Sequence, residues 1–116
     1  MKRIRIKLSP EAEEVFKYLN QQAPNSKLER MILKAVNQKT ELIKSNPHFG
    51  DGIPKSLIPE EYKIKYGVTN LFRVELPNFW RMLYTLKAED EIEIIAFILD
   101  IIDHNTYNKK FGYRKK

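Results

Sequence analysis

Two arginines, Arg73 and Arg81, and a histidine close to the end of the chain, His104, are the side chains best suited to chemistry. Cationic side chains attract polyanions, because each neutralised phosphate releases condensed counterions. Imidazole is the side chain whose unperturbed pKa lies near neutrality, which suits it to proton transfer. The formal net charge is +6. This charge favours a polyanion as ligand, although a modest positive charge can also serve solubility alone.

Other kinds of site lack their sequence signatures. The chain has no cysteine and two histidines, so we expect no disulfide, no thiolate chemistry and no bound transition metal. It has no glycine-rich phosphate loop and no Gly-x-Ser-x-Gly turn, and we predict no cofactor. The acidic residues at 60–61 and 89–91 fall in predicted turns, where solvation is a commoner role than acid or base catalysis.

The apolar segments are all short. The longest, Ile94–Leu99, is far too short to cross a bilayer. The charged start of the chain leads into alternating residues rather than an apolar run, so we expect no signal peptide. The 116 residues are the size of one ordinary domain. We therefore expect a single, soluble, cytoplasmic domain with no membrane partner.

The first half of the chain predicts a strand followed by a helical hairpin. Residues 2–8 alternate between apolar and basic side chains, as in a half-buried strand. Ser9 followed by proline is typical of a helix start, and residues 21–25 end this helix before Pro24. A second helix begins at Ser26, which has the spacing of a capping box, and continues to residue 46. The apolar stripes of this hairpin need a sheet to cover.

The second half predicts three strands and a tail. Residues 48–59 form a loop rich in glycine and proline, and residues 63–66 fit either a helix or an extended segment. Three runs with a period of two, at 70–76, 79–86 and 91–101, predict an antiparallel meander. The chain then ends in a short tail, 103–116. The predicted class is α+β, in the order β-α-α-β-β-β, with the hairpin packed on an antiparallel sheet.

This arrangement gives Arg73 and Arg81 the same orientation. They lie on adjacent strands of the meander, and each alternates out of phase with the core-facing residues. Both should therefore project from the sheet face that the helical hairpin does not cover.

Three segments resemble the RelE/ParE toxin superfamily. Residues 71–84, LFRVELPNFWRMLY, are similar to its central hairpin, in which an aromatic-basic strand turns into an aromatic-Arg-apolar-apolar-Tyr strand. Residues 52–57, GIPKSL, resemble its loop after the helical hairpin, and residues 103–107, DHNTY, resemble its C-terminal ending. The order of elements also matches, so the similarity extends over most of the chain.

The resemblance implies the toxin of a type II toxin-antitoxin system, which cleaves messenger RNA on the ribosome without a metal. In that reaction the ribose 2′-hydroxyl attacks the adjacent phosphate, which requires a base, an acid and a cation. Arg81 matches the arginine that holds the scissile phosphate, Arg73 matches a second basic position, and His104 and Tyr107 match the acid/base positions. A cognate antitoxin is the implied protein partner. The cations implied to hold the RNA backbone are Lys55, Lys63, Lys65, Lys109, Lys110 and Arg114.

Glu75 departs from the RelE pattern, which has lysine there. It could pair with Arg73, act as a base, or mark a chain that has lost cleavage. ParE-like members keep the fold but act on gyrase, so a non-catalytic protein that binds gyrase, RNA or an antitoxin is the alternative. Spacing alone also allows Arg81 to be an ion-pair partner of Glu75, and His104 and Tyr107 to be an exposed residue and a tail anchor.

Overall fold

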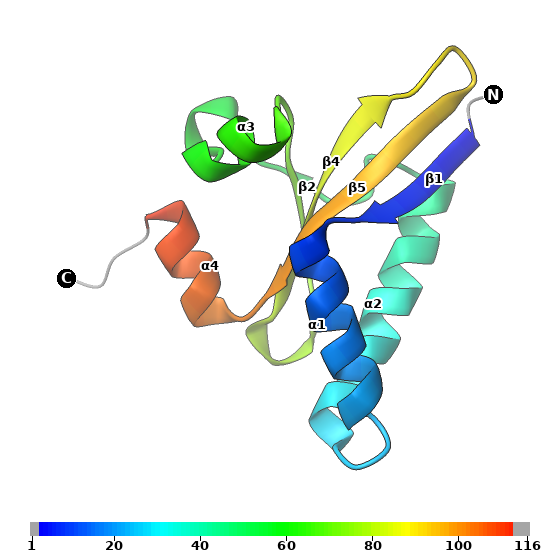
Figure 1. The fold of residues 1–116 in the computed structure, drawn as a ribbon, viewed down its shortest axis with the longest axis vertical. Helices are drawn as coiled ribbons and strands as arrows, with labels where there is room; N and C mark the ends of the chain where they lie inside the picture. The colour runs from blue at the N-terminus through cyan, green and yellow to red at the C-terminus, as the bar shows by residue number, and fades with distance from the viewer. Residues whose placement is uncertain (1–2, 113–116) are drawn as a thin grey trace.

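The computed structural model describes residues 3–112, which form an α+β fold with a five-stranded sheet (Figure 1). The strands are β1 (Arg3–Leu8), β2 (Asp51–Gly52), β3 (Phe72–Glu75), β4 (Arg81–Ala88) and β5 (Glu93–Ile102). The helices are α1 (Pro10–Gln22), α2 (Lys27–Ser45), α3 (Glu60–Tyr66) and α4 (His104–Phe111), with two 3₁₀ turns, η1 (Lys55–Leu57) and η2 (Pro77–Phe79). No helix in residues 3–112 is long and apolar enough to pass through a membrane.

The sheet has the strand order β1-β5-β4-β3-β2 and is mixed. β3, β4 and β5 form the predicted antiparallel meander, in which Glu75 lies opposite Arg81. β1 instead runs parallel to β5, with Arg3 opposite Glu93. The prediction of a wholly antiparallel sheet was wrong at this strand, because alternation specifies which face is buried but not the direction of the neighbouring strand. The long connection from β1 to β5 permits a parallel pair.

The helical hairpin begins where its serines predicted. The Ser9 hydroxyl accepts a hydrogen bond from the Ala12 amide at 3.0 Å and donates one to the carbonyl of Leu99 at 2.6 Å, which ties α1 to β5. The Ser26 hydroxyl accepts from the Glu29 amide at the start of α2. Both helices pack on one face of the sheet (Figure 1). The largest fully buried side chains of this first core are Leu19, Ile32, Ile43, Met82, Tyr84, Ile98 and Ile101.

A second core lies on the opposite face of the sheet, beneath α3 and α4. Its buried side chains are Ile58, Tyr62, Val68, Leu71, Leu83, Leu99, Ile102 and Tyr107. α3 includes residues 63–66, which are therefore helical, and Gly67 ends it with a left-handed backbone (φ 62°). The prediction of a short tail over 103–116 was wrong for residues 104–111, which form α4. The Asp103 carboxylate starts this helix by accepting a hydrogen bond from the Thr106 amide at 2.9 Å, which lowers the pKa of Asp103.

A bulge in β5 changes the face that its side chains occupy. Leu83 pairs with Asp100 and Tyr84 pairs with Ile98, so Leu99 is the extra residue. Leu99 packs in the second core, and the next side chain, Asp100, also contacts residues of α3 and α4. The bulge thus places a carboxylate among the apolar side chains that hold α4.

Candidate functional site

Arg73 and Arg81 project from the sheet face opposite the helical hairpin, as the alternation predicted. Both guanidinium groups contact Tyr107, which belongs to the second core. The Arg73 side chain is 32% exposed and the Arg81 side chain is 13% exposed. The face is therefore not open at this point, because α4 covers part of it and holds the two guanidinium groups against the sheet.

The start of α4 brings His104 and Tyr107 to the two arginines. One Nη1 of Arg73 donates a hydrogen bond to the Tyr107 hydroxyl at 3.1 Å, and this contact is the main cause that raises the pKa of Arg73 above its ordinary value. The Arg81 guanidinium lies over the Tyr107 ring, 4.6 Å from its centroid. Arg81 Nη1 also lies 3.2 Å from His104 Nδ1. Residues that are separated by up to 34 positions thus form one cluster.

The contact between Arg81 and His104 defines the state of the imidazole. A guanidinium can only donate, so His104 Nδ1 accepts and the remaining ring proton belongs to Nε2. The amide nitrogen of Asn108 lies 3.2 Å from Nε2, so a proton on Nε2 requires the Asn108 amide to turn and present its oxygen as the acceptor. A protonated imidazolium could not accept from Arg81. Arg81 Nη1 therefore has two acceptors, His104 Nδ1 and the Phe79 carbonyl oxygen.

Glu75 supplies the negative charge of the cluster. Its Oε2 lies 3.4 Å from Arg73 Nε and 3.6 Å from Arg81 Nε. Both Nε atoms are buried, and among residues 3–112 no atom accepts a hydrogen bond from either of them. The Glu75 side chain is 56% exposed. One oxygen of an exposed carboxylate thus lies close to both buried Nε donors.

The sequence did not indicate Asp51 as part of the site. It lies on β2, and its Oδ2 is 3.7 Å from Arg73 Nη2. Gly50 precedes it and fits tightly against β3 and β4: an added Cβ would lie 3.0 Å from the Arg73 carbonyl oxygen and 3.0 Å from Tyr84 Cε1. A cavity of about 200 Å³ opens beside Arg73 and Glu75, between these segments and α2.

Phe79 is a second residue that the sequence did not indicate. Asn78 and Phe79 both have positive φ angles, 59° and 61°, which are uncommon for residues other than glycine. The backbone carbonyl of Phe79 accepts a hydrogen bond from Arg81 Nη1 at 2.9 Å. Its ring is 69% exposed and lies 6.0 Å from the His104 ring. The turn therefore presents an aromatic ring to solvent beside the imidazole, at a cost of about 1–3 kcal/mol for such strained backbone. The signal for this turn was Pro77-Asn78, since asparagine tolerates the left-handed region.

The predicted RNA-binding lysines do not all lie free at the surface. Lys110 Nζ lies 2.7 Å from Glu61 Oε2 and 3.7 Å from Asp100 Oδ2, and its side chain is 20% exposed. Lys65 pairs with Glu11, and this contact is the main cause that lowers the pKa of Glu11 to about 2. Lys110 thus links α4 to α3, and Lys65 links α3 to α1.

The remaining predicted cations have different positions. Lys55 is exposed on η1, Lys63 on α3 and Lys109 on α4. Within residues 3–112, none of the three has a side-chain hydrogen bond or an ion pair. Arg114 lies outside the described residues. Lys109 and Lys110 lie on the same helix as His104, and of these two lysines Lys109 is the exposed one.

Comparisons of this chain with protein-family models, with curated proteins and with solved structures found no match. The function is therefore argued from the geometry of the cluster formed by Arg73, Glu75, Arg81, His104 and Tyr107, which is called the arginine cluster below.

Proposed function

We propose that this protein is a metal-independent endoribonuclease toxin of the RelE/ParE type, which cleaves messenger RNA on the ribosome in the cytoplasm. One observation carries the proposal: two buried guanidinium Nε atoms without a hydrogen-bond acceptor face a single position, beside an exposed imidazole. The hairpin-on-sheet architecture agrees with the resemblance of residues 71–84 to that superfamily.

The position of Glu75 Oε2 is the position for a phosphate oxygen. It lies within 3.6 Å of both Nε atoms. Guanidinium groups suit phosphate because their planar forks bind two oxygens together. An RNA phosphate would displace the exposed Glu75 carboxylate from the two Nε atoms and take its place. The displaced Glu75 carboxylate would then lie next to the bound phosphate.

The exposed side chains of the cluster are suited to move protons. In the proposed reaction the 2′-hydroxyl oxygen forms a bond to phosphorus while its proton passes to the Glu75 carboxylate. The bond from phosphorus to the 5′-oxygen breaks, and protonated His104 gives a proton to that oxygen. The products are a 2′,3′-cyclic phosphate and a 5′-hydroxyl, and the two guanidinium groups stabilise the charge on the phosphorane oxygens.

Tyr107 takes a positioning role in this proposal. Its relative exposure is 3%, so its hydroxyl is poorly placed to reach a leaving oxygen. It instead accepts from Arg73 and supports Arg81 on its ring face. Tyr107→Phe keeps the ring and removes the hydrogen bond from Arg73, so we expect a smaller loss of cleavage than for Arg81→Ala.

The test uses an mRNA in a purified translation system, with the wild type, Arg81→Ala and Lys34→Ala compared at equal concentration. Lys34 is exposed on α2, on the hairpin side, and is the control for loss of one positive charge. We expect the wild type and Lys34→Ala to cut the mRNA and leave 2′,3′-cyclic phosphate ends, and Arg81→Ala to be slower by at least about 100-fold. No cleavage by the wild type would end the nuclease proposal. Equal cleavage by the wild type and Arg81→Ala would end the assignment of the residues.

The ion pairs of Glu75 and Asp51 favour a second candidate function. Both carboxylates contact Arg73, and Glu75 also contacts Arg81, so the two arginine charges are matched by two carboxylates without a ligand. A non-catalytic protein of the same fold that binds gyrase, RNA or an antitoxin could use this surface for binding without moving protons. Inhibition of DNA supercoiling with mRNA left intact would select this function over cleavage. A short acidic reading frame beside the gene would support an antitoxin as partner.

A further inference from the structure

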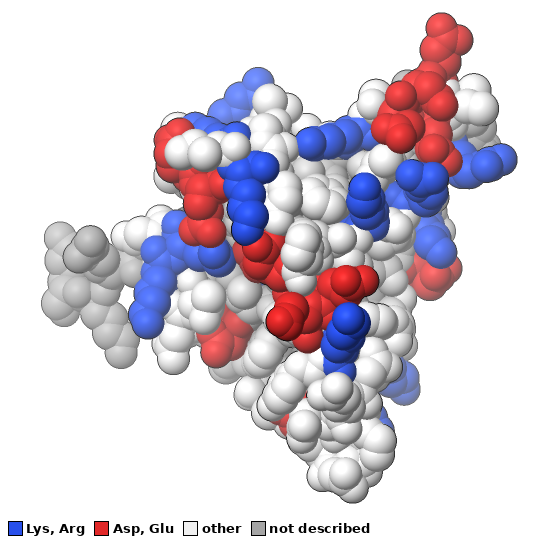
Figure 2. Space-filling model, viewed as in Figure 1, with Lys and Arg blue, Asp and Glu red and all other residues white. Residues whose placement is uncertain are grey.

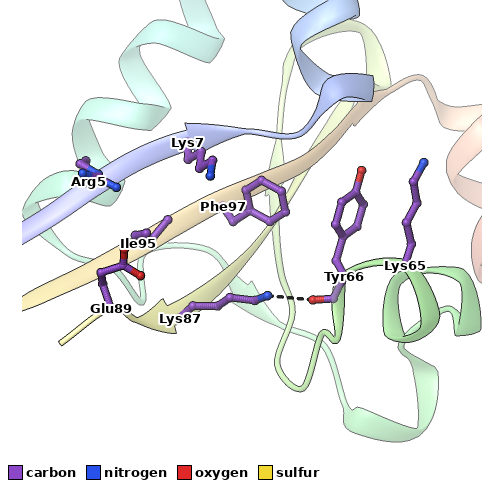
Figure 3. Close-up of a pocket in the computed structure, with 8 residues that line it drawn as sticks. All are labelled: Arg5, Lys7, Lys65, Tyr66, Lys87, Glu89, Ile95 and Phe97. Atoms are coloured by element: carbon purple, nitrogen blue, oxygen red, sulfur yellow. Dashed lines mark hydrogen bonds between the residues drawn. The ribbon is translucent and has the colours of Figure 1, made fainter.

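A groove of about 420 Å³ lies on the same sheet face as the arginine cluster but at the other end of β4. Arg5 and Lys7 of β1 form one side, and Lys65 and Tyr66 of α3 form the other, with Phe97 of β5 between them (Figure 3). Lys87, Glu89 and Ile95 complete the lining. Arg81 and Lys87 are six residues apart along β4, which is about 20 Å for an extended strand. The groove is therefore separate from the site proposed for cleavage.

The lining of the groove is cationic, and one of its lysines, Lys65, pairs with Glu11. The lining holds four Lys or Arg side chains and one carboxylate. Lys87 Nζ donates to the Tyr66 carbonyl oxygen at 2.8 Å, and Arg5 lies 3.8 Å from Glu93. Lys7 is exposed, and within residues 3–112 it has no side-chain hydrogen bond or ion pair. Figure 2 shows Lys and Arg side chains over β1 and α3, with Asp and Glu side chains beside them.

The groove also offers aromatic rings. Tyr66 and Phe97 meet edge to face, with ring centroids 5.2 Å apart, and their rings approach each other from α3 and β5 (Figure 3). Cations around aromatic rings are the pattern of surfaces that bind single-stranded nucleic acid, where bases stack on the rings and lysines follow the phosphates. An acidic peptide could gain charge contacts and pair with the outer edge of β1, which has no neighbouring strand among residues 3–112. Such a peptide would leave the rings of Tyr66 and Phe97 on the sheet face unused, whereas nucleic acid bases can stack on them.

An acidic region lies between the groove and α4. A small cavity there is lined by Glu11, Glu61 and Asp100 together with Lys65, which it shares with the groove, and Lys110 of α4. Glu11 pairs with Lys65, and Glu61 and Asp100 pair with Lys110, so within residues 3–112 this region offers a phosphate backbone no unpaired lysine. The groove is therefore separated from the arginine cluster by a surface that does not favour phosphate.

We infer that the groove of Arg5, Lys7, Lys65 and Lys87 is a second RNA site, which holds a single-stranded segment distinct from the phosphate that the arginine cluster takes. This inference requires RNA as a ligand but does not require cleavage. A stationary RNA contact of this kind would anchor the protein on a large RNA while the arginine cluster acts on another strand.

The experiment measures binding of a fluorescent single-stranded 12-nucleotide RNA, fully 2′-O-methylated so that it cannot be cleaved, by anisotropy at several salt concentrations. The variant Lys7→Ala/Lys87→Ala removes two groove cations, and Lys17→Ala/Lys34→Ala removes two exposed lysines from the hairpin. Each phosphate contact to a single strand contributes about 0.7 to the slope of log K against log salt, so the groove variant should lose about 1.4 of slope and bind about 25-fold more weakly at 0.1 M salt. The hairpin variant should bind like the wild type.

Two further variants make the result specific. Phe97→Leu keeps an apolar side chain in the second core but removes the ring, and we expect at least about fivefold weaker binding with urea unfolding close to that of the wild type. Arg81→Ala should retain most of the affinity for this RNA.

Equal affinities for the groove variant and the hairpin variant would overturn the inference. Groove-dependent binding of a hexaglutamate peptide, with no groove dependence for RNA, would overturn it in favour of an acidic protein partner. The two experiments can fail independently. If the wild type cleaves mRNA but the groove variant binds RNA normally, the groove inference is refuted and the proposed function stands. If the wild type does not cleave mRNA but Lys7→Ala/Lys87→Ala weakens RNA binding, the nuclease proposal is refuted and the groove inference stands.

Discussion

Replacing Glu75 by glutamine should strengthen RNA binding and weaken RNA cleavage in the same protein. The charged Glu75 side chain occupies the position proposed for a phosphate oxygen, and it also serves as the proposed base. Glutamine keeps nearly the same shape but has no charge and cannot take up the 2′-hydroxyl proton. The two measurements should therefore move in opposite directions.

The size of each effect follows from the geometry. Glu75 Oε2 makes two ion pairs, at 3.4 Å and 3.6 Å, and its side chain is 56% exposed. Exposed pairs contribute about 0.2–1 kcal/mol each, so a phosphate gives up about 1 kcal/mol when it displaces the carboxylate. Without that charge the affinity should rise about fivefold. Loss of a general base should slow cleavage by about 100-fold or more.

The assay measures Kd for a non-cleavable RNA and the rate of mRNA cleavage under saturating protein, for the wild type, Glu75→Gln and Asp51→Asn. Asp51 is the matched control, because it also places a carboxylate near Arg73, at 3.7 Å, but has no proposed role in proton transfer. We expect Asp51→Asn to bind slightly tighter and to cleave normally. Faster cleavage by Glu75→Gln would refute its role as base, and weaker binding would refute the idea that its oxygen marks the phosphate position.

Three further predictions concern the surroundings of the site. We expect the exposed Phe79 ring to stack on an RNA base, so Phe79→Ala should raise KM for RNA by about fivefold or more. The free energy of unfolding should change little, because Phe79 is 69% exposed. An unchanged KM would contradict stacking on this ring. Gly50→Ala should lower the free energy of unfolding by about 1–3 kcal/mol, because the added Cβ would lie 3.0 Å from the Arg73 carbonyl oxygen. Gly52→Ala should not lower it, because a Cβ there would meet no described atom within 4 Å. Urea titrations in which Gly52→Ala is the less stable variant would contradict this. Burial is the main cause that raises the pKa of Asp100 above 3.8, so the folded state holds this proton more tightly, and its contribution to stability is present below pH 3.8 and lost as pH rises through the raised pKa. Relative to Asp100→Asn, the wild type should become less stable in urea as pH is raised from about 3.5 to 7, and a difference independent of pH would contradict this.

Local patterns were sufficient for much of the fold. Ser9 and Ser26 start helices because their hydroxyl groups bond to nearby backbone amides, which is information within four residues. The orientation of Arg73 and Arg81 followed from alternation along two adjacent strands. These predictions depend on short-range geometry, and the structure agrees with them.

The elements that sequence reasoning missed depend on contacts between distant segments. α4 is short and strongly cationic at its end, and its interpretation as a tail overlooked the Asp103 cap and the spacing of Tyr107 and Phe111, whose rings stack at 4.3 Å. The parallel direction of β1 and the bulge at Leu99 depend on pairing partners that alternation does not identify. The pairing of Lys110 with Glu61 requires α3 and α4 to meet, which no local pattern specifies.

The arginine cluster has two parts with different attachments. Its arginines lie on strands paired on both sides within the sheet. Its imidazole and phenol belong to an eight-residue helix, which is held through side-chain contacts that include Tyr107 in the second core, the pairing of Lys110 with Glu61, and the contacts of Tyr107 and His104 with the two arginines. Helices of this length do not persist without such packing. Detachment of α4 would separate His104 from Arg81 while the sheet and the helical hairpin stay folded. The cluster can therefore come apart by a local opening that costs less free energy than global unfolding, and heating should abolish activity before the sheet melts.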